Sequence, residues 1–525
     1  MALLALLALA ALRPVGAGAG PGGAGPGGAG GACPAAPAGC VCAEGGARLT
    51  CRSAALRRLP PLHENLLSLD VSNNNISTLP RGALLPAAGL RELNLSMNRL
   101  ESVSEGALGG AALARLWLER CGLARLPARA LADLHHLHFL SAEDNFISEL
   151  EGGALRGCRA LRTLRLARNL LRDVPTHALA PLHHLQTLNL AGNLISELRD
   201  TALPPLPALH TLRLEENLLS EVPSAVRLLP LLEDLSLASN RVEVVAAGVL
   251  QACRRLARLE LRANPLSHVH ARALTHLPHL TTLVVSEARA LRELPSLNGT
   301  LRLRTLRADR ARLARLPAAL CSHAPQLRSL DVKLNALERV PDLRDCSELR
   351  VLDLSGNEIS ELDGESLRGL RRLHDLVLAR NRLRRVPAAA FTHTPDLQVL
   401  NLEDNMIEHI DMEAFVPISK LEDLNVGNNV FAWLPASGLQ RLLHLKAHNN
   451  PHLRHFHPPD LFPRIQTLVL SYAYHCCEFL PLMEAEGEEE AAGETASDLV
   501  ILPPQHIDAA AWANTTDIWA RYCEH

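Results

Sequence analysis

The stretch LQTLNLAGNLI, residues 185–195, follows the template LxxLxLxxNxL. Leu188 and Leu190 alternate with polar residues, which is the pattern of a short β-strand with one apolar and one solvated face. The leucine that opens the stretch and the isoleucine that closes it are expected to point into the same interior. Asn193 stands where the chain leaves the strand, and its amide can both donate to and accept from backbone groups that this turn buries.

The template recurs along most of the chain, usually every 24 residues. A period of this length with this template is typical of leucine-rich repeats, whose coils bury their apolar sides only against one another. We therefore predict an α/β leucine-rich-repeat solenoid of about 17 or 18 coils over residues 61–475. It should curve into a horseshoe with a concave parallel sheet, an irregular or short-helical convex side, and disulfide-capped ends. The first residues of the matching windows are Leu66, Leu90, Leu113, Leu137, Leu161, Leu185, Leu209, Leu232, Leu256, Leu280, Leu303, Leu327, Leu349, Leu373, Leu397, Leu421, Leu442 and Ile465.

Composition agrees with an elongated repeat domain. Hydrophobic residues make up 47% of the chain but aromatic residues only 3%, which fits a core built from layers of leucine. The formal net charge is −3, so no global field favours nucleic acid or an anionic membrane as a partner.

The amino-terminal segment has the pattern of a secretory signal peptide, which we place at residues 1–19. Its apolar run ALLALLALAAL is too short to span a bilayer and is followed by small residues that offer a cleavage site. Residues 20–32 are rich in glycine and cannot bury a core, so they are expected to be disordered. No apolar run of about 18 residues follows the signal. The chain as it stands is therefore expected to be soluble and extracellular.

A cysteine-rich segment at residues 33–60 is expected to cap the first coil. The open end of a solenoid exposes apolar side chains and unpaired strand edges, and a disulfide-bonded cap covers both. Zinc binding is the alternative, but secretion favours disulfides. The cysteines concerned are Cys33, Cys40, Cys42 and Cys51.

Asparagines at four positions begin the acceptor motif for N-glycosylation: Asn75, Asn94, Asn298 and Asn514. Asn94 projects from the strand face, so a glycan there would block the first coils. In that case a ligand would have to bind further along the wall.

Some coils depart from the asparagine pattern. Cys121 stands at the asparagine position and is expected to be a small buried substitute rather than a reactive nucleophile. Ala288 and Ala311 replace the amide in two adjacent coils. Together with an extra residue there, they predict a local irregularity in curvature at residues 285–313.

Four further cysteines lie on return segments. Cys321 and Cys346 are one repeat apart, and neighbouring coils stack about 5 Å apart, so we predict that they form a disulfide. Cys158 and Cys253 occupy the same place in coils too far apart to be bridged. They are expected to be buried free thiols.

The repeat pattern ends in SYAYHCCEFLPL, residues 471–482. Cys476 and Cys477 are adjacent, and because neighbouring cysteines seldom bond each other, both need other partners. The acidic segment 484–494 follows, and the tail supplies only Cys523. One cysteine of the pair is thus left without a partner, which suggests that the natural protein continues.

The sequence offers little support for catalysis. Paired histidines, such as His135 with His136, lack carboxylate or cysteine partners at ligand spacing and are expected to be solvated. No phosphate loop, nucleophile elbow or zinc-protease helix is present. We predict no enzyme, no metal site, no cofactor and no small-molecule substrate.

The concave strand face is the expected binding surface, because parallel strands present a preformed wall that lowers the ordering cost of binding. Trp117 and Phe139 project from this wall among charged residues, as in a protein-binding hot spot, although scattered exposed aromatics are also common. Arginines on the wall can pair with acidic groups of a partner, or equally with glutamates of the wall itself. The candidate ligand-binding residues are Arg115, Trp117, Glu119, Phe139, Ser141, Glu143, Arg165, Asn189, Arg213 and Glu215.

Taken together, residues 33–480 resemble type B leucine-rich-repeat G-protein-coupled receptors. The resemblance combines the cysteine cap, the repeats, the irregular stretch SEARALRELPSLNG (residues 286–299), the cysteine repeats that follow it, and the closing SYAYHCCEF. The closing motif is its most specific part and is most similar to the arthropod bursicon-receptor branch of the family.

That resemblance implies the ectodomain of a receptor that binds a cystine-knot dimer hormone of the bursicon type. It also implies a hinge over residues 476–525, then seven membrane helices that signal through G protein and cyclic AMP. In the family the double cysteine bonds to cysteines before the first membrane helix; Cys476 and Cys477 match the pair, and Cys523 matches one partner. The sequence stops before a membrane domain, so this chain is expected to bind ligand without itself signalling. The alternatives are an R-spondin-like ligand, or a secreted leucine-rich-repeat matrix or adhesion protein.

Overall fold

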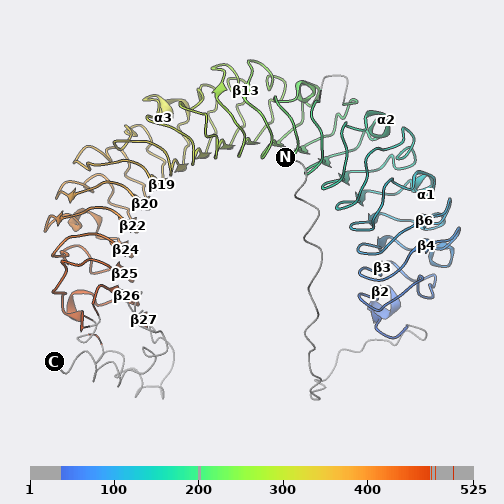
Figure 1. Ribbon diagram of the computed structural model, residues 1–525, viewed down its shortest axis with the longest axis horizontal. Coiled ribbons are helices and arrows are strands. Elements are labelled where there is room, and N and C mark those ends of the chain that lie inside the picture. Colours follow the sequence, from blue (N-terminus) through green and yellow to red (C-terminus); the bar gives the residue numbers. More distant parts are fainter. Residues whose placement is uncertain (1–36, 199–202, 473, 476–478, 480–499, 502–525) are drawn as a thin grey trace, which may run out of the picture.

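The chain winds into an open arc whose inner side is lined by strands (Figure 1). The computed structural model describes residues 37–198, 203–472, 474–475, 479 and 500–501. Within these residues, 21 strands form one continuous sheet, parallel except for the antiparallel pair β1–β2 at its amino-terminal end. The predicted solenoid is therefore confirmed.

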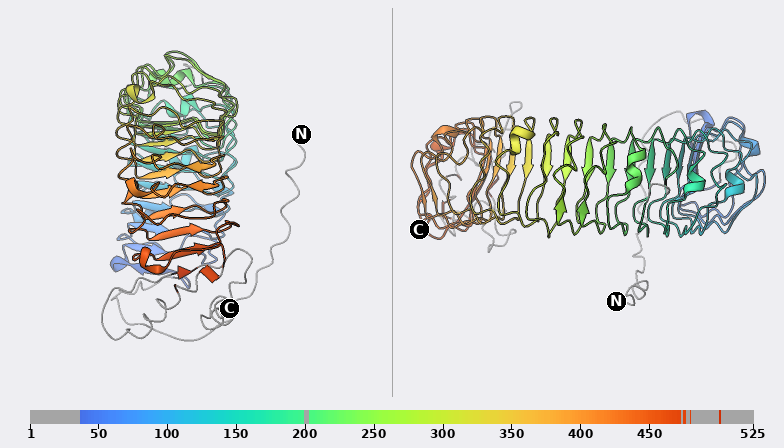
Figure 2. Two further views of the ribbon diagram at one scale, coloured as in Figure 1. Left: turned by 90° about the vertical axis from the view of Figure 1, so that its left-hand side faces the viewer. Right: turned by 90° about the horizontal axis from the view of Figure 1, so that it is seen from above.

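The strands of this sheet are short, and from β2 onward they recur once per coil and run parallel to one another (Figure 2). They are β1 (Val41–Ala43), β2 (Arg48–Thr50), β3 (Ser68–Asp70), β5 (Glu92–Asn94), β7 (Arg115–Trp117), β8 (Phe139–Ser141), β9 (Thr163–Arg165), β10 (Thr187–Asn189), β11 (Thr211–Arg213), β12 (Asp234–Ser236), β14 (Arg258–Glu260), β16 (Thr282–Val284), β17 (Thr305–Arg307), β18 (Ser329–Asp331), β19 (Val351–Asp353), β20 (Asp375–Val377), β22 (Val399–Asn401), β24 (Asp423–Asn425), β25 (His444–Ala447), β26 (Thr467–Leu470) and β27 (Val500–Ile501).

The outer side of the arc consists of irregular return segments with small elements, as expected. Its paired strands are β4 (Thr78–Leu79) with β6 (Ser102–Val103), β13 (Val244–Val245) with β15 (His268–Val269), and β21 (Arg385–Val386) with β23 (His409–Ile410). Its helical turns are α1 (Ala128–Leu131), α2 (Thr176–Leu179), α3 (Leu320–His323), η2 (Leu85–Ala87), η4 (Ser224–Leu228), η5 (Val416–Ile418) and η6 (Pro459–Leu461). A further turn, η1 (Glu44–Gly46), joins β1 to β2.

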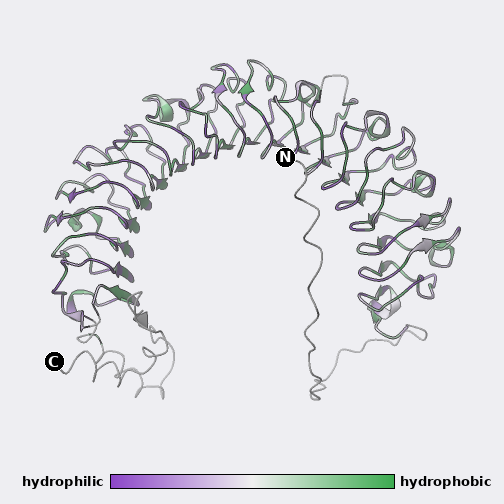
Figure 3. Ribbon diagram, in the orientation of Figure 1, coloured by the Kyte–Doolittle hydropathy of each residue, from purple (hydrophilic) through white to green (hydrophobic). Residues whose placement is uncertain are grey.

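The core runs continuously along the arc between the strands and the return segments. Leu185, Leu188, Leu190 and Ile195 are all fully buried, and the leucines of the other coils repeat this pattern. Figure 3 accordingly shows hydrophobic and hydrophilic residues alternating within each coil rather than separating along the arc. Each coil thus buries its apolar side only by stacking on its neighbours.

A buried asparagine in most coils links that coil to the one before it. The amide nitrogen of Asn193 donates to the carbonyls of Leu166 at 3.0 Å, Leu190 at 3.0 Å and Ala191 at 3.2 Å, while its oxygen accepts from Leu171 N at 3.0 Å. Two of these partners belong to the preceding coil. The predicted bonding of the Asn193 amide to buried backbone groups is therefore confirmed, and we call the row of such asparagines along the arc the ladder.

The residue before each ladder position has a left-handed backbone conformation, which turns the asparagine inward. Arg168 has φ 54° and Gly192 has φ 63° at equivalent positions. A Cβ on Gly192 would come within 3.0 Å of Arg168 Cγ. Only some coils use glycine here, so the stacking of neighbouring coils holds many non-glycine residues in a conformation they seldom adopt.

The coils that lack the asparagine remain paired with their neighbours in the sheet. Cys121 is buried and its thiol donates to the carbonyl of Leu95 at 3.3 Å, which confirms it as a small interior substitute. Around Ala288 and Ala311 the strands β14, β16, β17 and β18 remain paired in register. The missing amides therefore do not interrupt the sheet.

Cysteines of the cap and of the repeats form disulfides among the described residues. Cys40 bonds Cys51 in the cap, and Cys321 bonds Cys346 between adjacent coils with a Cα–Cα distance of 5.0 Å, as predicted. Cys42 is also disulfide-bonded. Cys33, Cys476, Cys477 and Cys523 lie outside the described residues, as do the proposed signal peptide and glycine-rich segment.

The two remaining thiols, Cys158 and Cys253, are buried and free, as expected. Burial raises the pKa of Cys158 to about 12 and that of Cys253 to about 11. Both thiols donate to a backbone carbonyl of the preceding coil, at 3.6 Å and 3.2 Å respectively.

Aromatic side chains close the carboxy-terminal end of the core. Phe456 stacks on Phe462 with ring centroids 5.7 Å apart and lies 6.2 Å from Phe479, and the latter two are buried. Phe462 and Phe479 belong to the same core as the leucine layers, and Phe456 packs against that core. Beyond it, β27 extends the sheet by pairing in parallel with β26.

Candidate functional site

Three side chains on adjacent strands stack on the concave wall near its amino-terminal third. The rings of Trp117 on β7 and Phe139 on β8 lie 5.2 Å apart, and the guanidinium carbon of Arg165 on β9 lies 5.4 Å from the Phe139 ring centre. Both aromatics are half-buried by this mutual contact, whereas Arg165 is exposed. We call these three residues the aromatic stack. They present a rigid apolar surface with a cation at one end.

The stack is bordered by polar groups that are already paired. Glu119 accepts a hydrogen bond from the Ser141 hydroxyl at 2.7 Å, and Arg115 forms an ion pair with Glu92 at 3.3 Å. Ser141 is fully buried, so its hydroxyl fixes the orientation of the half-exposed glutamate.

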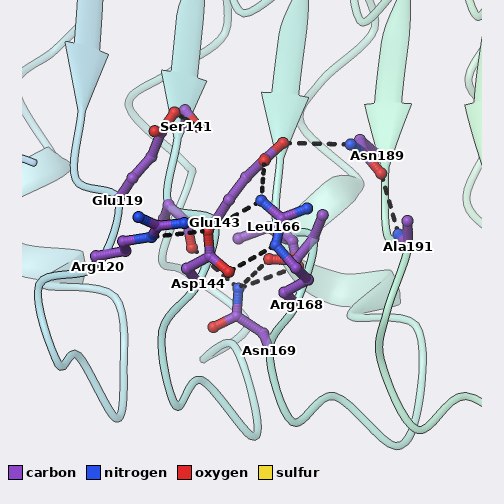
Figure 4. A network of polar contacts seen from close by, with 12 residues as sticks. Glu119, Arg120, Ser141, Glu143, Asp144, Leu166, Arg168, Asn169, Asn189 and Ala191 are labelled. Carbon is purple, nitrogen blue, oxygen red and sulfur yellow. Dashed lines mark hydrogen bonds and ion pairs between the residues drawn. The ribbon is translucent and has the colours of Figure 1, made fainter. Parts of the chain in front are cut away.

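A second cluster lies one row along the wall, where the chain leaves strands β8 and β9 (Figure 4). Arg168 contacts Asp144 at 2.6 Å and Glu143 at 3.0 Å, and Asn189 donates to the other oxygen of Glu143 at 3.2 Å. Arg120 adds a bond to Asp144 at 3.3 Å. Hydrogen bonds from Arg168 lower the pKa of Asp144, which favours the ionised form of this carboxylate.

Arg213 forms a third cluster with two carboxylates, at 3.6 Å from Glu215 and 3.5 Å from Asp234. One oxygen of each carboxylate is buried without a hydrogen-bond partner among the described residues. These oxygens are acceptors that a ligand donor or water would satisfy.

The structure thus decides between the pairings that the sequence left open. Arg213 does pair with Glu215 of its own wall. Glu143 forms an ion pair with Arg168 and accepts a hydrogen bond from Asn189. Arg165 forms no ion pair with any described residue. Arg165 is therefore the cation of the aromatic stack that remains available to an acidic partner.

Sequence reasoning missed a row of apolar side chains next to these clusters. In four neighbouring coils the residue after the ladder asparagine is apolar: Phe146, Leu170, Leu194 and Leu218. The first three are 63%, 43% and 39% exposed. The backbone of each is bonded to the preceding coil, so they form a line that we call the apolar edge. The signal was present in the sequence, as a run of four consecutive coils with a large apolar residue at a position that is charged or polar in about half of the other coils.

Three of the four predicted glycosylation sites lie within the described residues. Asn94 ends β5 on the concave wall, one strand before Trp117, and is half-buried. Asn75 and Asn298 are exposed. Asn75 lies outside the wall, after its own ladder asparagine.

Metal-binding groups, cavities and membrane-spanning helices are further features that would bear on function in the described part of the chain. No group of three or more metal-ligating side chains gathers there. Cavities of 480 to 680 Å³ are lined by return segments and do not include the wall residues named above. Among the described residues, no helix has the length and apolar character needed to cross a bilayer.

The sequence profile described as leucine rich repeat matches more than half of the chain. The matched segments are residues 64–123, 135–195, 159–219, 183–242, 230–289, 325–383 and 371–431. Among solved structures, the Toll–Spatzle complex of Drosophila matches with a TM-score of 0.64 and 22% identity, over 81% of this chain and 57% of that one. A leucine-rich-repeat protein of Leptospira interrogans matches with a TM-score of 0.63 and 24% identity, over 73% and 96%. Both support the fold.

Curated relatives narrow the family further. Leucine-rich repeat-containing G-protein coupled receptor 5 of Rattus norvegicus is 33% identical over 216 residues, which is 41% of this chain and 21% of the relative. Receptor 6 of Homo sapiens is 34% identical over 270 residues, covering 51% and 25%. Receptor 4 of Homo sapiens is 31% identical over 138 residues, covering 26% and 14%. The matched region is thus a quarter or less of the length of these relatives, and it points to a non-catalytic binding domain. The chain belongs to the leucine-rich-repeat family, and its repeats are homologous to those of the leucine-rich repeat-containing G-protein coupled receptors 4, 5 and 6.

Proposed function

We propose that this chain is the extracellular, hormone-binding part of a G-protein-coupled receptor, and that its concave wall binds a secreted protein. The aromatic stack is the observation that carries the proposal. Trp117 and Phe139 are only half-buried, and they lie beside polar side chains that already have partners, Glu119 with Ser141 and Arg115 with Glu92. A rigid aromatic surface bordered by polar groups that already have partners is typical of the centre of a protein interface.

The surroundings of the stack add specificity. Arg165 offers a cation with no acidic partner among the described residues, and the carboxylates beside Arg213 offer buried acceptors. The apolar edge continues the surface past the Arg168 cluster, so a ligand larger than one strand width would contact both. The strands hold these groups in place before binding, which reduces the ordering cost.

The ligand we propose is a cystine-knot dimer hormone of the bursicon type, because the closing motif at residues 471–479 resembles that of the bursicon-receptor branch. The full-length receptor would then signal through G protein and cyclic AMP. An R-spondin-like protein is the second candidate, because the matched curated relatives include mammalian receptors 4, 5 and 6. Because the chain spans only part of these relatives, the membrane domain and its signalling belong to the proposal. Secretion of the chain and glycosylation at Asn75, Asn94, Asn298 and Asn514 are also part of the proposal.

The test measures binding of purified bursicon to the full chain by surface plasmon resonance. Replacing Trp117→Ala together with Phe139→Ala should weaken binding at least tenfold, since interface anchors of this kind typically contribute more than about 1 kcal/mol each. The matched control is Val351→Ala with Val399→Ala, two half-buried apolar residues of the same wall on β19 and β22.

The control pair should change affinity less than twofold. If the Trp117 and Phe139 pair also stayed within twofold, the placement of the site would be wrong. Measuring an R-spondin in parallel distinguishes the two ligand classes. Binding of neither ligand would leave the matrix-protein alternative as the better one.

A further inference from the structure

Three arginines stand in a row at the edge of the sheet where strands begin. Arg304, Arg328 and Arg350 each directly precede a strand, namely β17, β18 and β19. Arg328 N donates to the carbonyl of Arg304 at 2.8 Å, and Arg350 N donates to that of Arg328 at 2.8 Å. Since neighbouring strands lie about 4.8 Å apart, the three exposed side chains leave the backbone one coil spacing apart. We call them the arginine row.

The row differs from two arginines of the same coils, which are paired. On the same strands and turns, Arg307 pairs with Asp331 at 3.5 Å and Arg310 pairs with Glu287 at 3.4 Å. By contrast, none of the three row arginines has an ion pair or side-chain hydrogen bond to a described residue. Because no acidic side chain pairs with them, the three guanidinium groups keep an unneutralised positive potential. At this spacing they also repel one another.

The surroundings of the row do not cancel this charge. The strand residues that follow Arg304 and Arg328 are Thr305 and Ser329, which are uncharged. The carboxylate of Glu348, two residues before Arg350, is already engaged by Arg372. Arg302, on the first coil of the row, is exposed, and its hydrogen bond is to the ring of His279, at 3.1 Å, rather than to a carboxylate.

We propose that the arginine row binds a sulfated polysaccharide that lies along the arc, across successive coils. The planar guanidinium group binds sulfate and carboxylate oxygens in bidentate fashion. A sulfated polysaccharide repeats such anions from sugar to sugar and can place them opposite each coil. An extended acidic peptide presents same-face side chains only every ~6.6 Å, which is out of step with a coil spacing of ~4.8 Å.

The choice of a polysaccharide over nucleic acid rests on the proposed extracellular location, but not on the proposed hormone. The row is on β17 to β19, whereas the aromatic stack is on β7 to β9. Polysaccharide and hormone binding can therefore fail or succeed independently.

The experiment applies the purified full chain to immobilised heparin and measures both the salt concentration of elution and the dissociation constant. The variant R304A/R328A/R350A removes the row. The control R99A/R241A/R441A removes the same charge from three exposed arginines that also lack ion pairs but lie in separate coils. Thermal unfolding of each variant checks that it is folded, and bursicon binding is measured on the same samples.

The row variant should bind heparin at least tenfold more weakly and elute at lower salt, while the control stays within threefold. Chemically desulfated heparin should fail to compete. Equal losses in both variants would overturn the proposal, because they would show binding by overall charge. Lack of heparin binding by the parent chain would overturn it too, as would stronger competition by the peptide EAEGEEEAAGE, residues 484–494, or by a single-stranded oligonucleotide.

Discussion

A single asparagine satisfies buried backbone groups from two coils at once, so its replacement should be among the most damaging in the chain. Asn193→Ala removes four hydrogen bonds and leaves backbone carbonyls and an amide of both coils unpaired in the interior. Unsatisfied buried groups cost about 1–3 kcal/mol each, partly relieved by local relaxation. We expect a loss of about 3 kcal/mol in unfolding free energy, measured by urea denaturation.

Cys121 provides the natural control for that experiment, because it occupies the same position with a weaker donor. Its thiol makes two sulfur contacts, to the carbonyls of Leu95 and Glu119. Cys121→Ala should therefore cost about 1 kcal/mol or less. If it destabilised the chain as much as Asn193→Ala, packing rather than hydrogen bonding would explain the ladder.

Buried thiols should be chemically silent while the chain is folded. Desolvation raises the pKa of Cys121 to about 11, and the pKa values of Cys158 and Cys253 are raised for the same reason. The thiolate is the reactive species, so almost none is present at pH 8. A thiol reagent such as DTNB should leave these three cysteines unmodified in native protein and label them after denaturation in guanidinium. Rapid labelling of a native sample, mapped to these residues by peptide mass, would contradict their burial.

The disulfide between Cys321 and Cys346 should stabilise the coils that it joins. It closes a loop of 25 residues between α3 and the return segment before β19. A link of this size contributes about 3 kcal/mol by restricting the unfolded chain. Cys321→Ala with Cys346→Ala should lower local stability by about that amount, seen as faster hydrogen exchange in β17 to β19.

The control for the disulfide is Cys158→Ala, which removes one buried thiol and no covalent bond. It should cost about 1 kcal/mol and leave exchange in β17 to β19 unchanged. Equal exchange in β17 to β19 for the parent and the double variant would show that the disulfide does not hold these coils together.

What the sequence predicted and what it missed follow from the geometry of a strand. Alternation fixes which face a side chain takes, so Trp117, Phe139 and Arg165 were correctly placed on the wall, and the coil period brought Cys321 beside Cys346. Alternation does not fix rotamers or diagonal contacts between coils. Long arginine side chains reach across such diagonals, which is why Arg168 rather than Arg165 engages Glu143. The apolar edge was missed because those residues follow the strand and lie outside the alternating pattern.

The arc has one continuous core, yet each coil contacts only its neighbours. This arrangement determines how far the destabilising effect of a local substitution extends along the arc. The strands pair in sequence from β2 to β27, so no contact of the sheet skips a coil. Stability in such an array is close to a sum of coil terms and nearest-neighbour terms. Whole-chain cooperativity is then limited, and distant coils should respond independently to a local change.

Hydrogen exchange of the Asn193→Ala variant tests this directly. The lost bonds join the coils of β9 and β10, so protection should fall most there and should recover within a few coils on either side. Strands β24 to β26, closed by the aromatic cluster of Phe456, Phe462 and Phe479, should exchange as in the parent chain. A uniform loss of protection from β2 to β26 would show instead that the arc opens as a single unit. The aromatic stack on β7 to β9 would then depend for its rigidity on coils at the far end of the molecule.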